Sequence, residues 1–192
     1  TLTCGKPVLL THQTIVDEHG NFKNLDFFEG NNDYDLFEVE QEWEAQIQKA
    51  LDANLDISHL DSHHHVHNFE KHKELAYKLA RKYKLPLRAN ETLPDDIVQV
   101  NRFEPNFDHV GAESEFRMRM YLENLLADIN TYDIVEVMCH PGYLDECVIE
   151  GSSLLENRAF VAQFMMHSKF SKAIKEMDSI QLVNYHHLKN KK

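Results

Sequence analysis

The chain is poor in cysteine, with Cys4, Cys139 and Cys147 as its three thiols among 192 residues. An odd and sparse set of cysteines argues against a disulfide framework and is typical of a reducing compartment. No CxxC pair is present, which argues against a structural zinc site of the finger type. We therefore expect a cytoplasmic protein that is stabilised by its core and not by cross-links.

Basic residues are also scarce, because 20 Lys and Arg stand against 32 Asp and Glu, a formal net charge of −12. Nucleic acid is an unfavourable partner for such a chain, since phosphate binding needs a basic face. No apolar run approaches the ~20 residues of a membrane span, and no basic-then-apolar leader suggests a signal peptide. The absence of GxSxG, P-loop and GxGxxG patterns removes the usual support for serine hydrolases, NTPases and dinucleotide-binding proteins.

Histidine, by contrast, is abundant, with thirteen residues, five of them between His59 and His67. Residues 55–60 are predicted to form a short strand that leads into this cluster. Imidazole and carboxylate side chains are common ligands of catalytic divalent metals. A polar surface tract is the alternative, and the position directly after a predicted strand favours a metal or catalytic site.

An extended chain through the cluster would place alternate side chains on one face. Asp61, His63, His65 and His67 would then point the same way. Alternate residues of a strand lie about 7 Å apart, so a single strand is a poor source of four ligands to one metal. We expect one or two of these histidines to bind metal and the others to position substrate or hold a ligand in place.

Helical spacing and apolar runs alternate along the chain, which predicts an α/β layer or barrel with parallel strands in one domain, 1–192. In such folds, sites gather at the C-terminal ends of strands. The pattern also predicts a hairpin over 14–22 and an irregular loop over 91–113. The expected helices cover 34–53, 68–83, 114–129 and 152–177 with a break near 168, and the expected strands cover 55–60, 85–88, 133–139 and 180–185.

A second candidate group follows the strongly apolar strand 133–139. His140 precedes a Pro-Gly turn at the strand end and is a candidate metal ligand or general acid–base group, with a histidine that only caps the strand end as the equal alternative. Asp145 and Tyr143 follow it as candidate substrate contacts, although a surface aspartate and a packing tyrosine are equal alternatives. Arg88, at the end of the strand 85–88, is a candidate for pairing with an active-site carboxylate or holding a substrate oxygen, and a plain surface arginine is the equal alternative. Cys139 is expected to face the core.

Four segments carry a resemblance to a known family: residues 59–67 (HLDSHHHVH), 136–142 (EVMCHPG), 2–8 (LTCGKPV) and 183–185 (VNY). Together they resemble the YdjC-like carbohydrate deacetylases, which include chitooligosaccharide deacetylases. The resemblance implies an irregular (β/α) barrel of the polysaccharide-deacetylase type. It also implies hydrolysis of N-acetyl groups from amino sugars, with release of acetate, and a divalent metal, usually Mg²⁺, with Zn²⁺ as the alternative.

The resemblance maps the metal-ligand histidine of the family onto His63 and an active-site histidine onto His140. We expect His140, Arg88 and Asp61 in catalytic roles, and His65, His67, Tyr143 and Asp145 as substrate contacts. The family's first strand carries an Asp-Asp pair, and a further histidine ligand falls about two residues before Thr1. Neither is present in this chain, so we expect an N-terminally truncated family member whose own activity is open.

Two other functions stay open at this stage. A His- and Asp-rich barrel mouth also suits a metal-dependent phosphoesterase, although such enzymes use bridging carboxylates that the cluster lacks. The third alternative is an inactive fragment that only binds metal or sugar. The expected partner is a small N-acetylated sugar, and a homodimer is an open alternative to a monomer.

Overall fold

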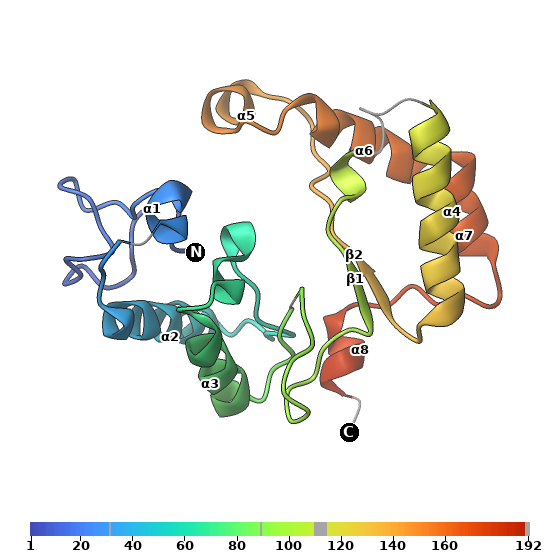
Figure 1. Ribbon diagram of the computed structural model, residues 1–192. Helices are drawn as coiled ribbons and strands as arrows, with labels where there is room; N and C mark the ends of the chain where they lie inside the picture. The colour runs from blue at the N-terminus through green and yellow to red at the C-terminus, as the bar shows by residue number, and fades with distance from the viewer. Residues whose placement is uncertain (31, 89, 110–114, 191–192) are drawn as a thin grey trace. The chain divides into compact units, whose positions relative to one another are not determined.

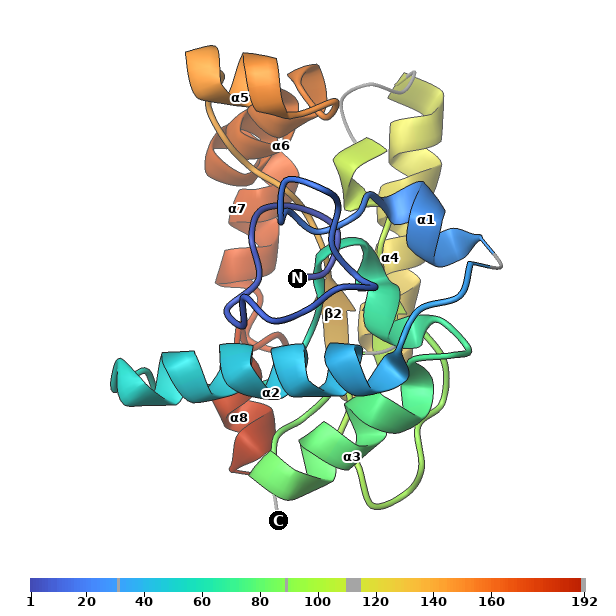
Figure 2. The same cartoon turned by 90° about the vertical axis from the view of Figure 1, so that its left-hand side faces the viewer.

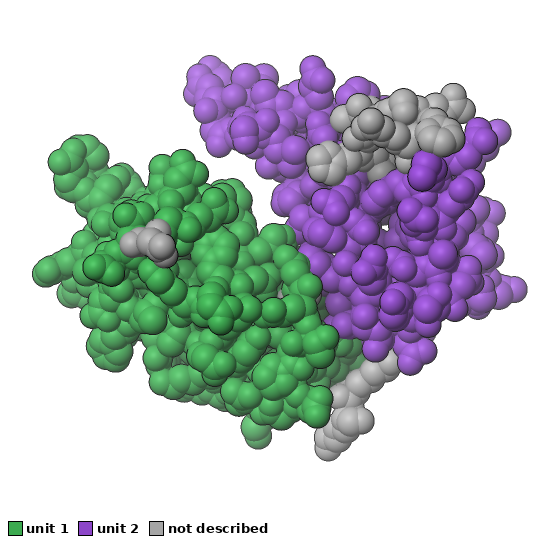
Figure 3. Space-filling view, in the orientation of Figure 1, with its two compact units in different colours: residues 1–99, 184–192 green, residues 100–183 purple. Residues whose placement is uncertain are grey.

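The structure is a computed structural model that describes residues 1–30, 32–88, 90–109 and 115–190. The chain divides into two compact units, Thr1–Gln99 with Asn184–Lys192, and Val100–Val183 (Figure 3). The expectation of one domain over 1–192 stays a prediction. No helix in the described ranges is long and apolar enough to cross a membrane.

The first unit opens with the predicted hairpin, which is confirmed by an antiparallel bridge between Val16 and Phe22. Its tip is closed by Asp17, whose backbone N–H donates to the Asn21 carbonyl at 2.8 Å. A short helix that was not predicted, α1 (Leu25–Glu29), follows the hairpin.

Two amphipathic helices, α2 (Leu36–Asp52) and α3 (Lys73–Tyr83), form the base of this unit (Figure 2). Both confirm predicted helices, but α3 begins five residues later than expected, with His72 at its N-cap. Asp35 caps α2 by accepting the Phe37 backbone N–H. The apolar faces of the two helices enter one core, whose buried members are Leu2, Ile15, Phe22, Phe28, Val39, Trp43, Val66, Ala76, Tyr77, Leu79, Ala80, Leu87, Leu93 and Ile97.

The predicted strands 55–60 and 85–88 are reduced to a single parallel bridge between Leu60 and Leu87. An extended strand through the histidine cluster, the condition for alternating side chains, is not observed. The chain leaves the extended conformation after Ser62, and residues His63–Asn68 form 3-10 turns with a kink at His64 and His65. Alternation therefore does not describe which histidines share a face.

The second unit is built on a two-stranded parallel sheet, in which β1 (Arg102–Glu104) pairs with β2 (Val135–Val137) (Figure 1). Strand β2 lies inside the predicted strand 133–139, whereas β1 lies in the segment that was expected to be irregular. Helix α4 (Glu115–Thr131) connects the two strands, as a parallel crossover requires. The predicted start of this helix at Ser114 lies outside the described residues.

The remaining helices confirm one prediction and contradict another. Helices α6 (Glu156–His167) and α7 (Lys169–Glu176) meet at the expected break, where Ser168 caps α7 by accepting the Ser171 backbone N–H. The prediction of a final strand over 180–185 was wrong, because Asn184 caps a short helix there, α8 (Tyr185–Lys189). Helix α5 (Glu146–Gly151) was not predicted. The core of the second unit contains Phe107, Leu125 and Val161.

Parallel pairing and crossover helices make this an α/β fold. The predicted barrel goes beyond what the two units show separately, and it stays a prediction.

Candidate active site

The histidine cluster begins where the Leu60–Leu87 pairing ends. The Leu60 N–H donates to the Pro86 carbonyl at 2.8 Å, and the Arg88 N–H donates to the Leu60 carbonyl at 3.0 Å. These two bonds fix the chain just before Asp61. The cluster therefore lies at the C-terminal end of an extended segment, as expected for a site in an α/β fold.

Two consecutive histidines of the cluster have left-handed backbone conformations. The φ angles of His64 and His65 are 57° and 52°, a conformation that costs roughly 1–2 kcal/mol per non-glycine residue. The side chain of Thr3 lies against this turn, with its Oγ1 3.0 Å from His64 Nδ1. Strain of this kind concentrates at functional sites. The same turn leaves the side chain of His63 exposed and that of His65 half-buried.

His67 is placed differently from its neighbours, because it is 4% exposed. Its Nδ1 lies 2.6 Å from Ser62 Oγ, and its Nε2 lies 2.5 Å from the Arg88 carbonyl oxygen. Burial lowers the pKa of His67 to about 4, so the ring is neutral at pH 7. Both ring nitrogens are bound by the protein, which leaves neither for the substrate contact that the sequence suggested.

Arg88 pairs with Asp61, with Nη1 2.5 Å from Oδ2. Pairing with a carboxylate was one of the alternatives that the sequence left open for Arg88. The guanidinium carbon lies 6.0 Å from the ring centre of Tyr185, which itself stacks on the His59 ring at 3.8 Å. The beginning of α8 thus supports the ion pair through an aromatic ring.

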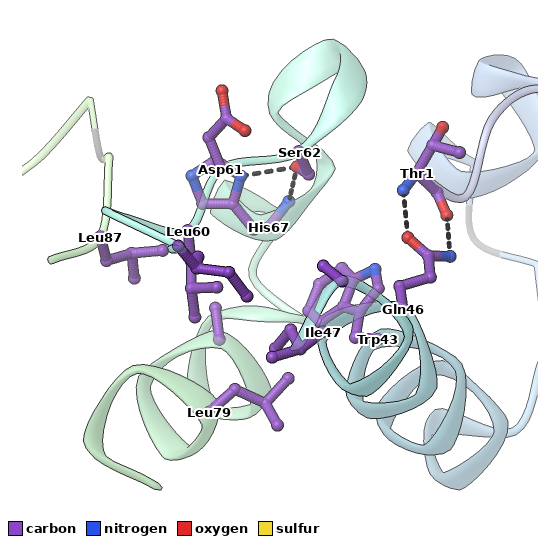
Figure 4. Close-up of a pocket in the computed structure, with 13 residues that line it drawn as sticks. Thr1, Trp43, Gln46, Ile47, Leu60, Asp61, Ser62, His67, Leu79 and Leu87 are labelled. Atoms are coloured by element: carbon purple, nitrogen blue, oxygen red, sulfur yellow. Dashed lines mark hydrogen bonds between the residues drawn. The ribbon is translucent and has the colours of Figure 1, made fainter. Parts of the chain in front are cut away.

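A cavity of about 220 Å³ lies beside the turn in the first unit (Figure 4). Thr1, Gln46, Asp61, Ser62 and His67 are its polar lining residues, and the others are apolar. The cavity is smaller than the roughly 300–1,000 Å³ of typical ligand sites, so we place no sugar in it. Its lining residues are Thr1, Trp43, Gln46, Ile47, Ala50, Ile57, Leu60, Asp61, Ser62, His67, Ala76, Leu79 and Leu87.

His140 follows β2 in the second unit and is held by an aspartate that the sequence did not suggest. Asp108 Oδ1 accepts the His140 backbone N–H at 2.7 Å, and its Oδ2 lies 2.6 Å from His140 Nδ1. Asp108 is buried, while the His140 side chain is 44% exposed. A carboxylate at Nδ1 directs the other ring nitrogen, Nε2, away from the pair. The arrangement suits a group that exchanges a proton at Nε2.

The other predicted residues near His140 have identifiable local roles. Asp145 caps α5, because its Oδ1 accepts the Val148 backbone N–H at 2.9 Å. Tyr143 is 78% exposed, and its hydroxyl lies 3.7 Å from Met166 Sδ. Burial raises the pKa of the half-buried Cys139 thiol, in keeping with the expectation that this cysteine is structural. With 78% of its surface exposed, Tyr143 is accessible enough to stack on a sugar ring.

Residues 1–176 match the sequence profile of a family described as YdjC-like protein. The chain belongs to this family. Its curated relatives include two proteins named carbohydrate deacetylase. The protein from Halalkalibacterium halodurans is 34% identical over 163 residues, covering 82% of this chain and 67% of the relative. The protein from Listeria monocytogenes serotype 4a is 39% identical over 162 residues, covering 82% of this chain and 64% of the relative.

A solved structure has a fold similar to that of this YdjC-like chain. A candidate cellobiose-phosphate cleavage protein from Enterococcus faecalis superposes with a TM-score of 0.81 at 28% identity, covering 98% of this chain and 75% of the other. The matched part spans about two thirds of the two curated relatives. Family membership is thus established, and the activity of the whole protein is a matter for a proposal.

The resemblance to the YdjC-like family leads us to expect a divalent metal, which needs a group of ligand side chains. Throughout the described ranges, no three His, Cys, Asp or Glu side chains are grouped so that they could hold a metal ion. A catalytic metal typically takes about three protein ligands, so the described residues do not form a complete site around His63. His63 belongs to the first unit and His140 to the second, and their convergence on one pocket stays a prediction.

Proposed function

We propose that this chain provides the histidine-bearing part of a carbohydrate deacetylase, which removes N-acetyl groups from amino sugars such as chitooligosaccharides and releases acetate. Membership of the YdjC-like family and the names of the two curated relatives support the proposal. The observation that carries it within the structure is the buried Asp108 carboxylate against His140.

In the proposed reaction, water adds to the carbonyl carbon of the N-acetyl group, and the C–N bond then breaks. The departing amine needs a proton, and His140 supplies it from Nε2 while Asp108 holds Nδ1. The carboxylate stabilises the positively charged ring before the transfer and keeps its orientation afterwards. The His140 ring is neutral after this step and regains its proton from solvent.

Asp61 is the proposed acceptor of the proton from the attacking water. Arg88 holds one of its oxygens at 2.5 Å and sets the direction of the carboxylate. The Asp61 side chain is 41% exposed, which permits contact with water and substrate. This assignment requires the two units to bring Asp61 and His140 to the same substrate, as a complete (β/α) barrel would.

A divalent metal remains part of the proposal for the whole enzyme, with His63 as the ligand that the chain supplies. Because the described residues offer no group of three ligands, no step above depends on the metal.

The experiment is to measure acetate release from diacetylchitobiose with the full chain and three variants. We expect His140→Ala to lower the rate by at least about 100-fold, the lower range for a positioned acid–base group. Asp61→Asn is expected to lower the rate of acetate release by a similar factor. The exposed control His19→Ala should release acetate at the rate of the parent chain. Undiminished acetate release by His140→Ala would reject the proposed role, and no release by the parent chain would reject the activity of this polypeptide.

A second candidate function follows from the Enterococcus faecalis structure, whose name refers to cleavage of a phosphorylated disaccharide. The same assay should therefore include phosphorylated and unphosphorylated disaccharides with and without N-acetyl groups. Release of phosphate or of a monosaccharide, in place of acetate, would favour this second function.

A further inference from the structure

The pairing between residues 60 and 87 stops in an unusual way. In a parallel ladder, the N–H of Leu60 donates to residue 86 and its carbonyl accepts from residue 88, as observed here. The next donor in the ladder would be the Ser62 N–H, directed at the Arg88 carbonyl. That carbonyl instead lies 2.5 Å from Nε2 of His67, five residues further along the chain.

The hydrogen bonds define the tautomer of the His67 ring. A carbonyl oxygen only accepts, so Nε2 carries the proton and donates to Arg88. Nδ1 is then the acceptor, and the Ser62 hydroxyl donates to it at 2.6 Å. The same hydroxyl oxygen accepts the His67 backbone N–H at 3.1 Å. The ring and the Ser62 side chain thus close residues 62–67 into a loop.

We propose that His67 is a positioning residue of the site, whose neutral imidazole replaces a strand N–H at Arg88, ends the ladder after Leu60 and holds the turn that presents His63. The proposal rests on the proposed function for its catalytic consequence. One ring contacts Ser62 in the turn and the backbone of Arg88, whose side chain pairs with Asp61. It therefore couples the turn that carries His63 to the Asp61–Arg88 pair.

Burial supports this role. His67 is 4% exposed at the edge of the cavity in Figure 4, and burial keeps its pKa at about 4. A charged ring would lose the acceptor at Nδ1, because both nitrogens of imidazolium are donors. The neutral form is the one that fits both partners.

A simple structural role for a buried histidine is the competing explanation, and His12 provides a matched control. It is 7% exposed and its Nε2 lies 3.1 Å from Glu42, and among the described residues no hydrogen bond of His12 reaches the turn. Replacing either ring by leucine removes a buried imidazole from the first unit. A purely structural role predicts that both variants change stability and leave kcat alone.

The test compares His67→Leu, His67→Gln and His12→Leu in the full chain. Glutamine keeps an N–H donor near the Nε2 position, so it can still reach the Arg88 carbonyl. We expect His67→Leu to lower kcat by about 10- to 100-fold, the range for residues that orient catalytic groups, with little change in KM. His67→Gln should recover most of this loss, and folded His12→Leu should retain the parental kcat. Equal kcat values for folded His67→Leu and His12→Leu would overturn the proposal.

A measurement without substrate separates this inference from the proposed function. Nitrogen NMR of the imidazoles should show His67 protonated at Nε2 and unprotonated at Nδ1 at pH 7. The opposite tautomer would overturn the positioning role even in an active deacetylase. If the parent chain releases no acetate, the expected tautomer still supports the structural part of the inference. The imidazole signal of His63 then replaces kcat as the readout. We expect this signal to be disturbed in His67→Leu but not in His12→Leu. An undisturbed signal would then overturn it.

Discussion

Asp108 binds one residue, His140, through both of its carboxylate oxygens, one to the backbone N–H and one to the ring. The Asp108 carbonyl in turn accepts a hydrogen bond from the Asn157 side chain at 2.7 Å. The aspartate is thus held on both sides before any substrate arrives. Preorganisation of this kind is what a proton-transferring group requires.

Replacement of the Asp108 carboxylate should therefore impair turnover more than folding. Asp108→Asn keeps the size of the side chain but removes the charge and one acceptor of the His140 ring. We expect a lower kcat for acetate release, by a smaller factor than in His140→Ala, and a near-parental KM. Asp128→Asn, which alters an ion pair with Arg102, is the control. A parental kcat in folded Asp108→Asn would contradict the role given to this pair.

Glu42 should be a major determinant of stability in the first unit. It is 0% exposed, and its carboxylate accepts the backbone N–H groups of Val8 and Leu9 and lies 3.1 Å from His12 Nε2. Removing one partner of such a buried pair costs about 3–5 kcal/mol. We expect Glu42→Ala to lower the free energy of unfolding by this order.

The measurement for Glu42 is urea unfolding followed by the fluorescence of Trp43, the single tryptophan of the chain. Glu40→Ala is the matched control, because Glu40 lies on the same helix and pairs with the exposed Lys78. An exposed pair contributes little, so this variant should unfold near the parental urea concentration. Equal urea midpoints for Glu42→Ala and Glu40→Ala would show that the contacts of Glu42 with Val8, Leu9 and His12 do not stabilise the first unit.

Sequence patterns predicted the elements that depend on local periodicity. Helix α2 follows from apolar spacing, and the α6–α7 break lies near Ser168 as expected. The extended conformation considered for the histidine cluster is not observed, because the geometry of the cluster depends on a long-range hydrogen bond from His67 to Arg88. No alternation rule contains that bond. The final strand was wrong for a local reason, since the capping side chain of Asn184 starts a helix there.

The candidate site was predictable in part. Placement after strand ends singled out His140 and the cluster at His63 as candidates, and pairing with a carboxylate was one of the alternatives given for Arg88. Asp108 was missed because β1 was not recognised in the segment 91–113, so nothing marked the residues after it as a strand end. A short strand of three residues gives little periodicity to detect. Pro105, directly after the short segment Arg102–Glu104, was the available signal, since proline cannot donate a hydrogen bond to a strand ladder.

Stability of the first unit should fall on mild acidification because of His67. Its pKa is lowered from 6.5 to about 4 by burial, so the unfolded chain binds a proton that the folded chain rejects. The stabilising contribution is present above pH 6.5 and is lost as the pH falls toward 4. A shift of this size corresponds to roughly 3 kcal/mol. Burial also lowers the pKa of His72, which adds to the effect in the same direction.

This pH dependence is measured by urea unfolding between pH 7 and pH 4, again through Trp43. The parent chain should lose stability across the range, and His67→Gln should lose less because it has no group to titrate there. The difference between the two slopes isolates His67 from His72 and from the carboxylates. Parallel slopes would contradict the lowered pKa of His67.

Metal binding by the 192-residue chain should be weak. His63 is exposed at a strained turn, but the described residues contain no group of three side chains that could hold a metal. Affinity for zinc rises with the number of fixed ligands, and catalytic sites typically supply about three. Calorimetric titration with Zn²⁺ and with Mg²⁺ should therefore give shallow curves. His63→Ala should flatten the Zn²⁺ curve further, whereas His19→Ala, at an exposed position of the hairpin, should leave it unchanged. Stoichiometric binding with submicromolar affinity would show that the units assemble a complete metal site, with ligands drawn from both.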